Sequence, residues 1–164
     1  MGERSVDRSF LAELKIPVHE DFIPVAKMVA ATLGGLLGFS LEEVDELKIA
    51  VAQAFDSIQE EAEQLWGAED TLLRLVYGST GGGITVDVEA IGPSRTTHPE
   101  ARPLPRAAPP RMVPIAAHPA LLRRQAAERA LQREMIRLFV DDFRQQVDSG
   151  NGAIRFRMVK YLIS

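Results

Sequence analysis

Hydrophobic and polar residues alternate near the start of the chain. Every second position from residue 10 to residue 18 is apolar: Phe10, Ala12, Leu14, Ile16 and Val18. A repeat of two residues predicts a β-strand with one buried face. Pro17 lacks the N–H that a strand partner would need, so we expect this strand to end there or to lie at the edge of a sheet.

Two helices are predicted next, because the apolar positions now recur every three or four residues. The first begins near Glu20 or Asp21, has Pro24 in its first turn and ends at Gly38. Its expected apolar stripe comprises Val25, Met28, Val29, Leu33 and Leu36. The second begins with the capping box Ser40–Glu43. Its expected buried face, opposite an acidic outer face, comprises Leu41, Val44, Leu47, Val51, Ala54, Phe55, Ile58 and Leu65.

Two hairpins and a third helix account for most of the remaining chain. The strands Thr71–Tyr77 and Ile84–Ala90 are joined by a glycine-rich segment, which predicts a hairpin with a flexible loop at 78–83. A helix is expected over Pro119–Asp142, with an apolar stripe of Leu121, Leu122, Ala126, Leu131, Met135, Leu138 and Phe139. The strands Phe143–Val147 and Ile154–Tyr161 are separated by an Asn-Gly pair, which favours a tight hairpin turn.

Residues 93–119 break these patterns. Eight of the ten prolines fall here, together with Arg95, Arg102, Arg106 and Arg111. Helices and strand ladders do not tolerate this density of proline, so we expect a mobile surface loop or a polyproline-like arm. The remaining elements predict one α+β domain over 1–164. We expect a two-layer sandwich, with a mixed, mainly antiparallel five-stranded sheet and three helices on one face.

Composition and charge narrow the possible functions. The chain has no cysteine, which excludes thiolate metal sites, and His19, His98 and His118 are too scattered to predict a metal site. The charged N-terminus and the interrupted apolar stretch at 25–39 favour a cytoplasmic protein with no membrane partner.

The charge is unevenly distributed along the chain. Residues 1–92 hold 17 acids and 6 bases, whereas residues 93–164 hold 6 acids and 13 bases. This asymmetry can steer a charged partner or attract the two halves to each other, within one copy or between two. The net charge of −4 argues against a nucleic-acid partner.

Three segments carry a resemblance to a known family. Leu47–Ile58 resembles a helix whose pattern is Val-x-Glu-Ala-x-x-Asn-Ala, Ile154–Leu162 is similar to a terminal strand, and Ile136–Phe143 is similar to the helix end before it. They resemble the nucleotide-binding domain of the GHKL superfamily, which includes histidine kinases and DNA gyrase. Within it, the chain is most similar to the bacterial anti-sigma-factor serine/threonine kinases of the RsbW and SpoIIAB type. The resemblance covers most of residues 10–162, and the segment 93–119 would stand in place of the ATP lid.

The resemblance implies a site for ATP and Mg²⁺, but its chemistry is altered. In the family, a helix carboxylate acts as base, and an asparagine four residues later on the same face holds the magnesium. Here the position of the base is Gln53 and the position of the magnesium ligand is Ser57. Because glutamine cannot accept a proton at neutral pH, we predict no catalytic residue at these positions. Asp56 is rotated by about 100° and could substitute only if the helix were turned.

The positions that would recognise the nucleotide are also altered. The aspartate that accepts a hydrogen bond from adenine corresponds to Ala90, with Gly92 and Ser94 after it. The glycine-rich phosphate loop corresponds to Gln125–Glu134, which contains no glycine and favours uninterrupted helix. We also expect Trp66 to be a packing residue at a helix end.

These differences favour a pseudokinase that needs neither ATP nor Mg²⁺ and regulates transcription by binding other proteins. The resemblance implies a sigma factor or a STAS-domain anti-anti-sigma protein as partner, and a homodimer or a heterodimer with a paralogue. The alternative is an active serine/threonine kinase that uses ATP and Mg²⁺, with Asp56 or Ser57 as displaced ligands, to phosphorylate a STAS antagonist. A third hypothesis is a structural module with no sigma-related partner.

Overall fold

The computed structural model describes residues 9–67, 71–92, 119–150 and 152–163. The elements in chain order are β1 (Ser9–Pro17), a short 3-10 helix η1 (Glu20–Phe22), α1 (Ile23–Leu36), α2 (Leu41–Trp66), β2 (Leu72–Thr80), β3 (Gly83–Ile91), α3 (Pro119–Phe139), β4 (Asp142–Val147) and β5 (Ile154–Tyr161). The predicted order of strands and long helices is confirmed. The proline-rich segment lies outside the described residues, except that Pro119 is the first residue of α3. No helix in the described ranges is long and apolar enough to cross a membrane.

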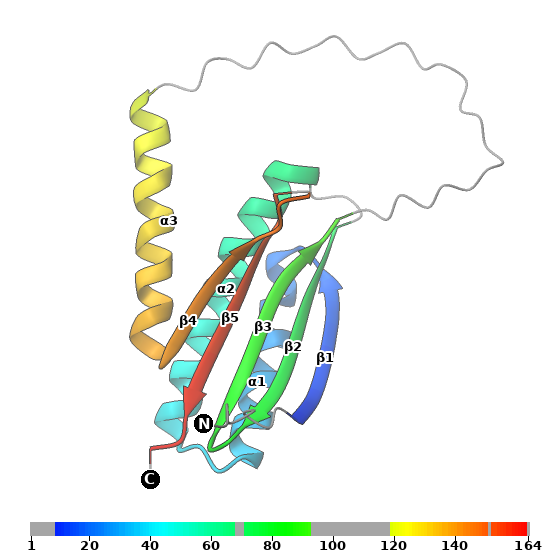
Figure 1. Cartoon of the computed structure of the whole chain (residues 1–164), viewed down its shortest axis with the longest axis vertical. Coiled ribbons are helices and arrows are strands. Elements are labelled where there is room, and N and C mark those ends of the chain that lie inside the picture. The colour runs from blue at the N-terminus through cyan, green and yellow to red at the C-terminus, as the bar shows by residue number, and fades with distance from the viewer. Residues whose placement is uncertain (1–8, 68–70, 93–118, 151, 164) are drawn as a thin grey trace, which may run out of the picture.

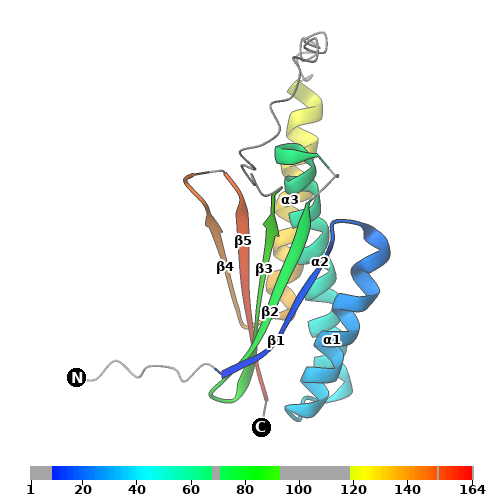
Figure 2. The same cartoon turned by 90° about the vertical axis from the view of Figure 1, so that its right-hand side faces the viewer.

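The five strands form one sheet in the order β1-β2-β3-β5-β4. Every neighbouring pair of described strands is antiparallel, so the predicted α+β class is confirmed but the expected mixed sheet is not. The reason is that the C-terminal hairpin joins the sheet through its second strand, β5, which runs opposite to β3. The three helices lie on one face of the sheet, and no described element covers the other face (Figures 1 and 2).

The strand β1 lies at the edge of the sheet, as Pro17 predicted. Ile16 and Val18 are buried as expected. Phe10 was expected on the same buried face but is 67% exposed. The pairing of β1 with β2 shifts register between Phe10 and Ala12, and this irregularity separates the first residues of the strand from the alternation that follows.

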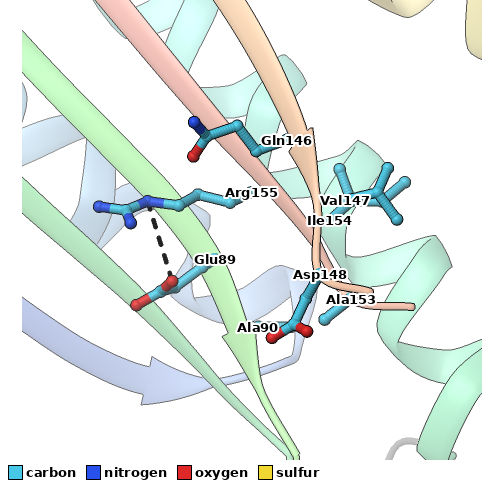
Figure 3. Close-up of a pocket in the computed structure, with 8 residues that line it drawn as sticks. All are labelled: Glu89, Ala90, Gln146, Val147, Asp148, Ala153, Ile154 and Arg155. Atoms are coloured by element: carbon cyan, nitrogen blue, oxygen red, sulfur yellow. Dashed lines mark ion pairs between the residues drawn. The ribbon is translucent and has the colours of Figure 1, made fainter. Parts of the chain in front are cut away.

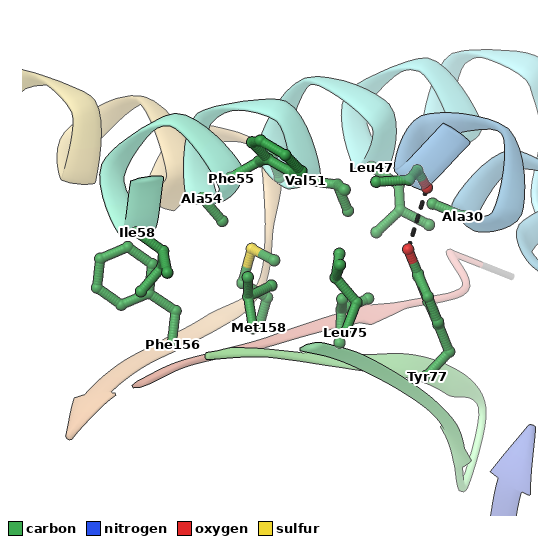
Figure 4. Close-up of a cluster of buried hydrophobic side chains, with 14 of the residues drawn as sticks. Ala30, Leu47, Val51, Ala54, Phe55, Ile58, Leu75, Tyr77, Phe156 and Met158 are labelled. Atoms are coloured by element: carbon green, nitrogen blue, oxygen red, sulfur yellow. Dashed lines mark hydrogen bonds between the residues drawn. The ribbon is translucent and has the colours of Figure 1, made fainter. Parts of the chain in front are cut away.

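The core forms where α2 lies across β2, β3 and β5 (Figure 4). The predicted buried face of α2 is confirmed in its middle turns, but Leu41 is 86% and Leu65 40% exposed because these residues lie at the helix ends. The predicted capping box is also confirmed. The Ser40 Oγ accepts from the Glu43 N–H at 3.2 Å, and Glu43 Oε2 accepts from the Ser40 N–H at 2.7 Å.

The helix α1 buries a face that is shifted from the predicted one: Val29 and Leu33 of the predicted stripe pack partly against the core, but neither is fully buried. Its buried residues are Ala26, Ala30 and Gly34, whereas Met28 is 69% and Leu36 78% exposed. Small residues let α1 lie close against α2: a Cβ added at Gly34 would be 3.3 Å from the nearest methyl carbon of Val44. The buried Tyr77 hydroxyl also donates to the Ala26 carbonyl at 3.0 Å, a contact drawn in Figure 4. Close backbone approach, rather than the largest side chains, therefore selects the buried face.

The glycine-rich loop predicted at 78–83 is a tight turn instead. Strands β2 and β3 pair as far as Thr80 and Gly83, which leaves two residues between them. Gly82 has a φ of 93°, a conformation that favours glycine. A Cβ at Gly83 would lie 2.5 Å from the Lys160 carbonyl oxygen. These glycines serve a sharp turn and close strand packing rather than flexibility.

The helix α3 ends at Phe139, three residues before the predicted end, and it is mostly exposed. Ile136 is its one buried residue. Of the predicted apolar stripe, Phe139 packs against the core, but the leucines do not: Leu121, Leu122, Leu131 and Leu138 are 50%, 52%, 63% and 77% exposed. The reason is that α3 lies along α2 rather than over the sheet, and only its last turns reach the core. Lys160, which is 5% exposed, fixes that end by donating to Glu46 Oε2 at 2.6 Å and to the Phe139 carbonyl at 3.1 Å.

Ala30→Leu is expected to destabilise the protein by about 1–3 kcal/mol, because the larger side chain has no room between α1 and α2. Met28→Ala removes an exposed side chain, and we expect it to change the free energy of unfolding by less than about 0.5 kcal/mol. Urea denaturation followed by circular dichroism measures both changes. A large loss for Met28→Ala with a small one for Ala30→Leu would show that α1 buries the opposite face.

Candidate functional site

The residues predicted to hold magnesium lie on α2, which faces α3 at this point. Ser57 is buried, and its hydroxyl donates to Gln132 Oε1 of α3 at 2.8 Å. Gln53 lies one turn earlier on α2 and is half-buried. The Ser57 hydroxyl is therefore already engaged, through its hydrogen, in a contact between two helices.

Further polar contacts join α2 and α3 beside the Ser57–Gln132 hydrogen bond. Arg129 of α3 donates to Gln64 Oε1 at 2.7 Å and forms an ion pair with Glu61 at 3.3 Å. We call these five residues, Ser57, Glu61, Gln64, Arg129 and Gln132, the polar seam. The Ser57–Gln132 hydrogen bond is partly buried and contributes about 1 kcal/mol, whereas the Arg129–Gln64 hydrogen bond is exposed and contributes less. Together these polar contacts join α3 to α2.

Beside Ser57, where α2 and α3 meet β5, the seam leaves almost no space, although a hollow of about 350 Å³ opens farther along the two helices at Gln64 and Arg129. The hollow beside Ser57 has a volume of about 10 Å³ and is lined by Ser57, Glu61, Arg129, Gln132, Arg133, Ile154 and Phe156. A volume of this size is at the limit for a single water molecule, whereas small-molecule sites usually enclose several hundred Å³. In this arrangement Ser57 is closed off from any ligand as large as a phosphate group.

Asp56 is adjacent to Ser57 in sequence, but its side chain lies in a different environment. Burial raises the pKa of the Asp56 carboxyl, and the negative charges of Glu60 and Glu20 raise it further. A raised pKa makes a carboxylate a better proton acceptor. However, the negative charge that acts on Asp56 comes from Glu20 in η1, just before α1, whereas Ser57 contacts α3. The structure therefore does not bring the two candidate ligands to one site.

The other predicted positions lie at the end of β3, beside an open cleft. Pairing between β3 and β5 stops at Glu89 and Arg155, while β5 continues to pair with β4. The separation creates a cleft of about 490 Å³ (Figure 3), lined by Glu89, Ala90, Gln146, Val147, Asp148, Ala153, Ile154 and Arg155. Ala90 presents only a methyl group there. Ile154 lines both this cleft and the small hollow, so the two are neighbours.

Gly92 is held by packing against Trp66. A Cβ added at Gly92 would lie 2.8 Å from an indole carbon of Trp66. Trp66 ends α2 and packs partly against the core, which confirms its prediction as a helix-end packing residue. This close contact with the indole is enough to explain a glycine at position 92. Ser94 lies outside the described residues.

The uncovered face of the sheet carries a network of ion pairs. Arg74 bonds both Glu13 and Glu89 across three strands, and Arg155 and Arg157 both bond Asp87. Burial alone would raise the pKa of Asp87, but the two arginines outweigh it and hold that pKa below its usual value. Each charge has an opposite neighbour, so these residues form no patch of a single sign.

Sequence reasoning missed the α3 residues that close the site. Gln132 and Arg129 are three positions apart, so they share a helix face, but that spacing is equally typical of a solvated helix. Nothing in the sequence distinguished their partners on α2 from other polar residues. No three acidic or histidine side chains in the described ranges come together as a metal site.

Comparisons with known proteins do not identify a family for the chain. No protein-family model matches it, and no curated protein matches it. Its function must therefore be inferred from the seam and the cleft.

Asp56→Asn is expected to stabilise the protein at pH 7. Because the folded-state pKa of Asp56 is raised, its contribution to stability is complete below the unfolded-state pKa and is lost as the pH rises through the folded-state pKa. The neutral amide in the Asp56→Asn variant does not ionise, so the variant keeps this stability at pH 7. The melting temperature of the variant should exceed that of the wild type at pH 7, and the difference should disappear below about pH 3. Thermal melts across this range test this, and a variant less stable at pH 7 would contradict the assigned environment.

Proposed function

We propose that this protein is a non-catalytic regulator related to the anti-sigma-factor kinases of the GHKL superfamily, and that it acts by binding other proteins. The observation that carries the proposal is the engagement of Ser57 by Gln132. This hydrogen bond joins α3 to α2, and the hollow that remains beside Ser57 has a volume of only about 10 Å³, which is too small for a phosphate group.

The energetics of nucleotide binding support a loss of affinity. Binding at 1 µM corresponds to about 8 kcal/mol in total. Losing the hydrogen bond to adenine at Ala90 removes a few kcal/mol, because a site that recognises a polar group rejects a mismatch strongly. Losing magnesium removes much of the electrostatic stabilisation of the phosphates. Little binding energy remains once both contributions are absent.

A surface on α1 supports a role in protein binding. Met28 is exposed, and an apolar hollow of about 380 Å³ beside it is lined by Ile23, Pro24, Lys27, Met28, Ala31 and Lys48. Exposed apolar side chains with a charged rim are typical of protein-binding surfaces. The resemblance suggests a sigma factor or a STAS-domain protein as the partner in a bacterial cell.

A second candidate is an active kinase, and the cleft beside Ala90 is the observation that favours it. Its volume of about 490 Å³ is sufficient for a small-molecule ligand, and Asp148 supplies a carboxylate. However, Asp148 Oδ1 already accepts from the Gly150 N–H at 2.7 Å, within the hairpin turn. Catalysis would also need α3 to move away from Ser57.

Isothermal titration of the protein with Mg-ATP tests the non-catalytic part of the proposal. We expect no binding tighter than roughly 100 µM, for the energetic reason given above. Tighter binding would contradict the proposal. Transfer of labelled phosphate to a STAS protein, abolished by Asp56→Ala, would establish the kinase instead.

Met28→Glu tests the partner surface. Against purified sigma factors and STAS proteins from the source organism, we expect binding that is independent of ATP and at least about tenfold weaker in the variant, because a charge would be buried in an apolar contact. Leu122→Glu makes the same change on α3, at a side chain that is 52% exposed, and should leave binding unaltered. Biolayer interferometry measures these affinities. If no sigma factor or STAS protein binds, the proposed partner class is wrong.

A further inference from the structure

The side of α3 that faces away from α2 carries an ordered stripe of exposed residues. They are Ala120, Arg124, Ala127, Leu131, Glu134 and Leu138. Their spacings of four and three residues place them on one helix face. The opposite face contains Arg129, Gln132 and Ile136, which contact α2 or the core. Figure 1 shows α3 on the flank of the molecule, with the sheet and the other helices to one side of it.

The stripe is complementary to itself when one copy is reversed. It is symmetric about position 129, so reversal places Ala120 opposite Leu138, Arg124 opposite Glu134 and Ala127 opposite Leu131. Each leucine then faces an alanine, and each arginine faces a glutamate. We propose that two copies of this protein associate through α3, with the two helices antiparallel.

Packing and charge both favour the antiparallel arrangement. A large residue opposite a small one lets two helices approach closely and interdigitate. Leu131 and Leu138, 63% and 77% exposed in one copy, would both be covered. A parallel pair would instead place Arg124 against Arg124 and Glu134 against Glu134. Like charges at these distances are destabilising, which selects the reversed orientation.

The charged residues of the stripe are available for such contacts. Arg124 pairs with Glu128 at 3.1 Å, and Glu134 with Arg137 at 2.5 Å, within α3 itself. All four side chains are more than half exposed. Ion pairs of this kind contribute little to stability, so Arg124 and Glu134 can reorient toward a second copy. The self-complementarity identifies the occupant as a second copy, and the inference does not rest on the proposed function.

Single charge reversals and their combination test the pairing. Arg124→Glu places two acids opposite each other, and Glu134→Arg places two bases opposite each other. Each variant alone should raise the dissociation constant of the dimer roughly tenfold. An equimolar mixture of the two single variants should associate again, because every contact between the unlike copies joins opposite charges. The double variant Arg124→Glu/Glu134→Arg should also regain the wild-type affinity.

Sedimentation equilibrium from about 5 to 500 µM measures these constants, a range that spans the micromolar affinities typical of small interfaces. Circular dichroism verifies that each variant remains folded, and the mixture controls for any effect within one helix. Leu131→Ala should also weaken the dimer, whereas Leu122→Ala, on another side of α3, should not. A wild-type protein that stays monomeric at the highest concentration would overturn the proposal. Single variants as tight as the wild type, or a mixture that does not recover, would overturn it equally.

Discussion

The structure depends on the packing of α2, which is held on three sides. One side of this 26-residue helix covers the sheet, another receives the small residues of α1, and a third meets α3 at the polar seam. The capping box fixes the start of α2, and Glu43 in that box also accepts from the Ile163 N–H at 3.1 Å. Because these contacts act together, α2 cannot rotate to exchange Ser57 for Asp56 without disrupting the core.

The seam determines what this arrangement can do. The face of α2 toward the sheet is dry and closely packed, whereas its contact with α3 consists mainly of hydrogen bonds and ion pairs. Such contacts position a helix but stabilise it weakly. We therefore expect α3 to be the described helix that opens most easily. Lys160 secures its C-terminal end, while the N-terminal turns extend beyond the core.

Sequence patterns predicted the elements better than the faces they bury. The capping box, the pairing of β4 with β5 and the edge position of β1 each follow from a local rule, and all were confirmed, whereas the predicted Asn-Gly turn contains Asn151, which lies outside the described residues. The buried face predicted for α1 was right only at Val29 and Leu33, because periodicity favours large apolar residues such as Met28, whereas close packing selected Ala30. The stripe predicted on α3 was wrong for another reason: leucines indicate burial only where a partner element exists to cover them.

The candidate site was predictable only in part. The sequence singled out Ser57 and Ala90, and in the structure the hollow beside Ser57 and the cleft beside Ala90 share Ile154 as a lining residue. Nothing in the sequence indicated the role of Gln132, because a contact between residues 75 positions apart depends on how the helices pack. The cleft beside Ala90 likewise arises from the separation of two strands, which no local pattern encodes.

The most direct test of this account is a double-mutant cycle on Ser57 and Gln132, measured as free energies of unfolding. Ser57→Ala and Gln132→Ala each remove one partner of the hydrogen bond that closes α3 onto α2. We expect a coupling energy of about 1 kcal/mol between them. Strictly additive effects would show that the two side chains do not interact, and the closed site would then lose its basis.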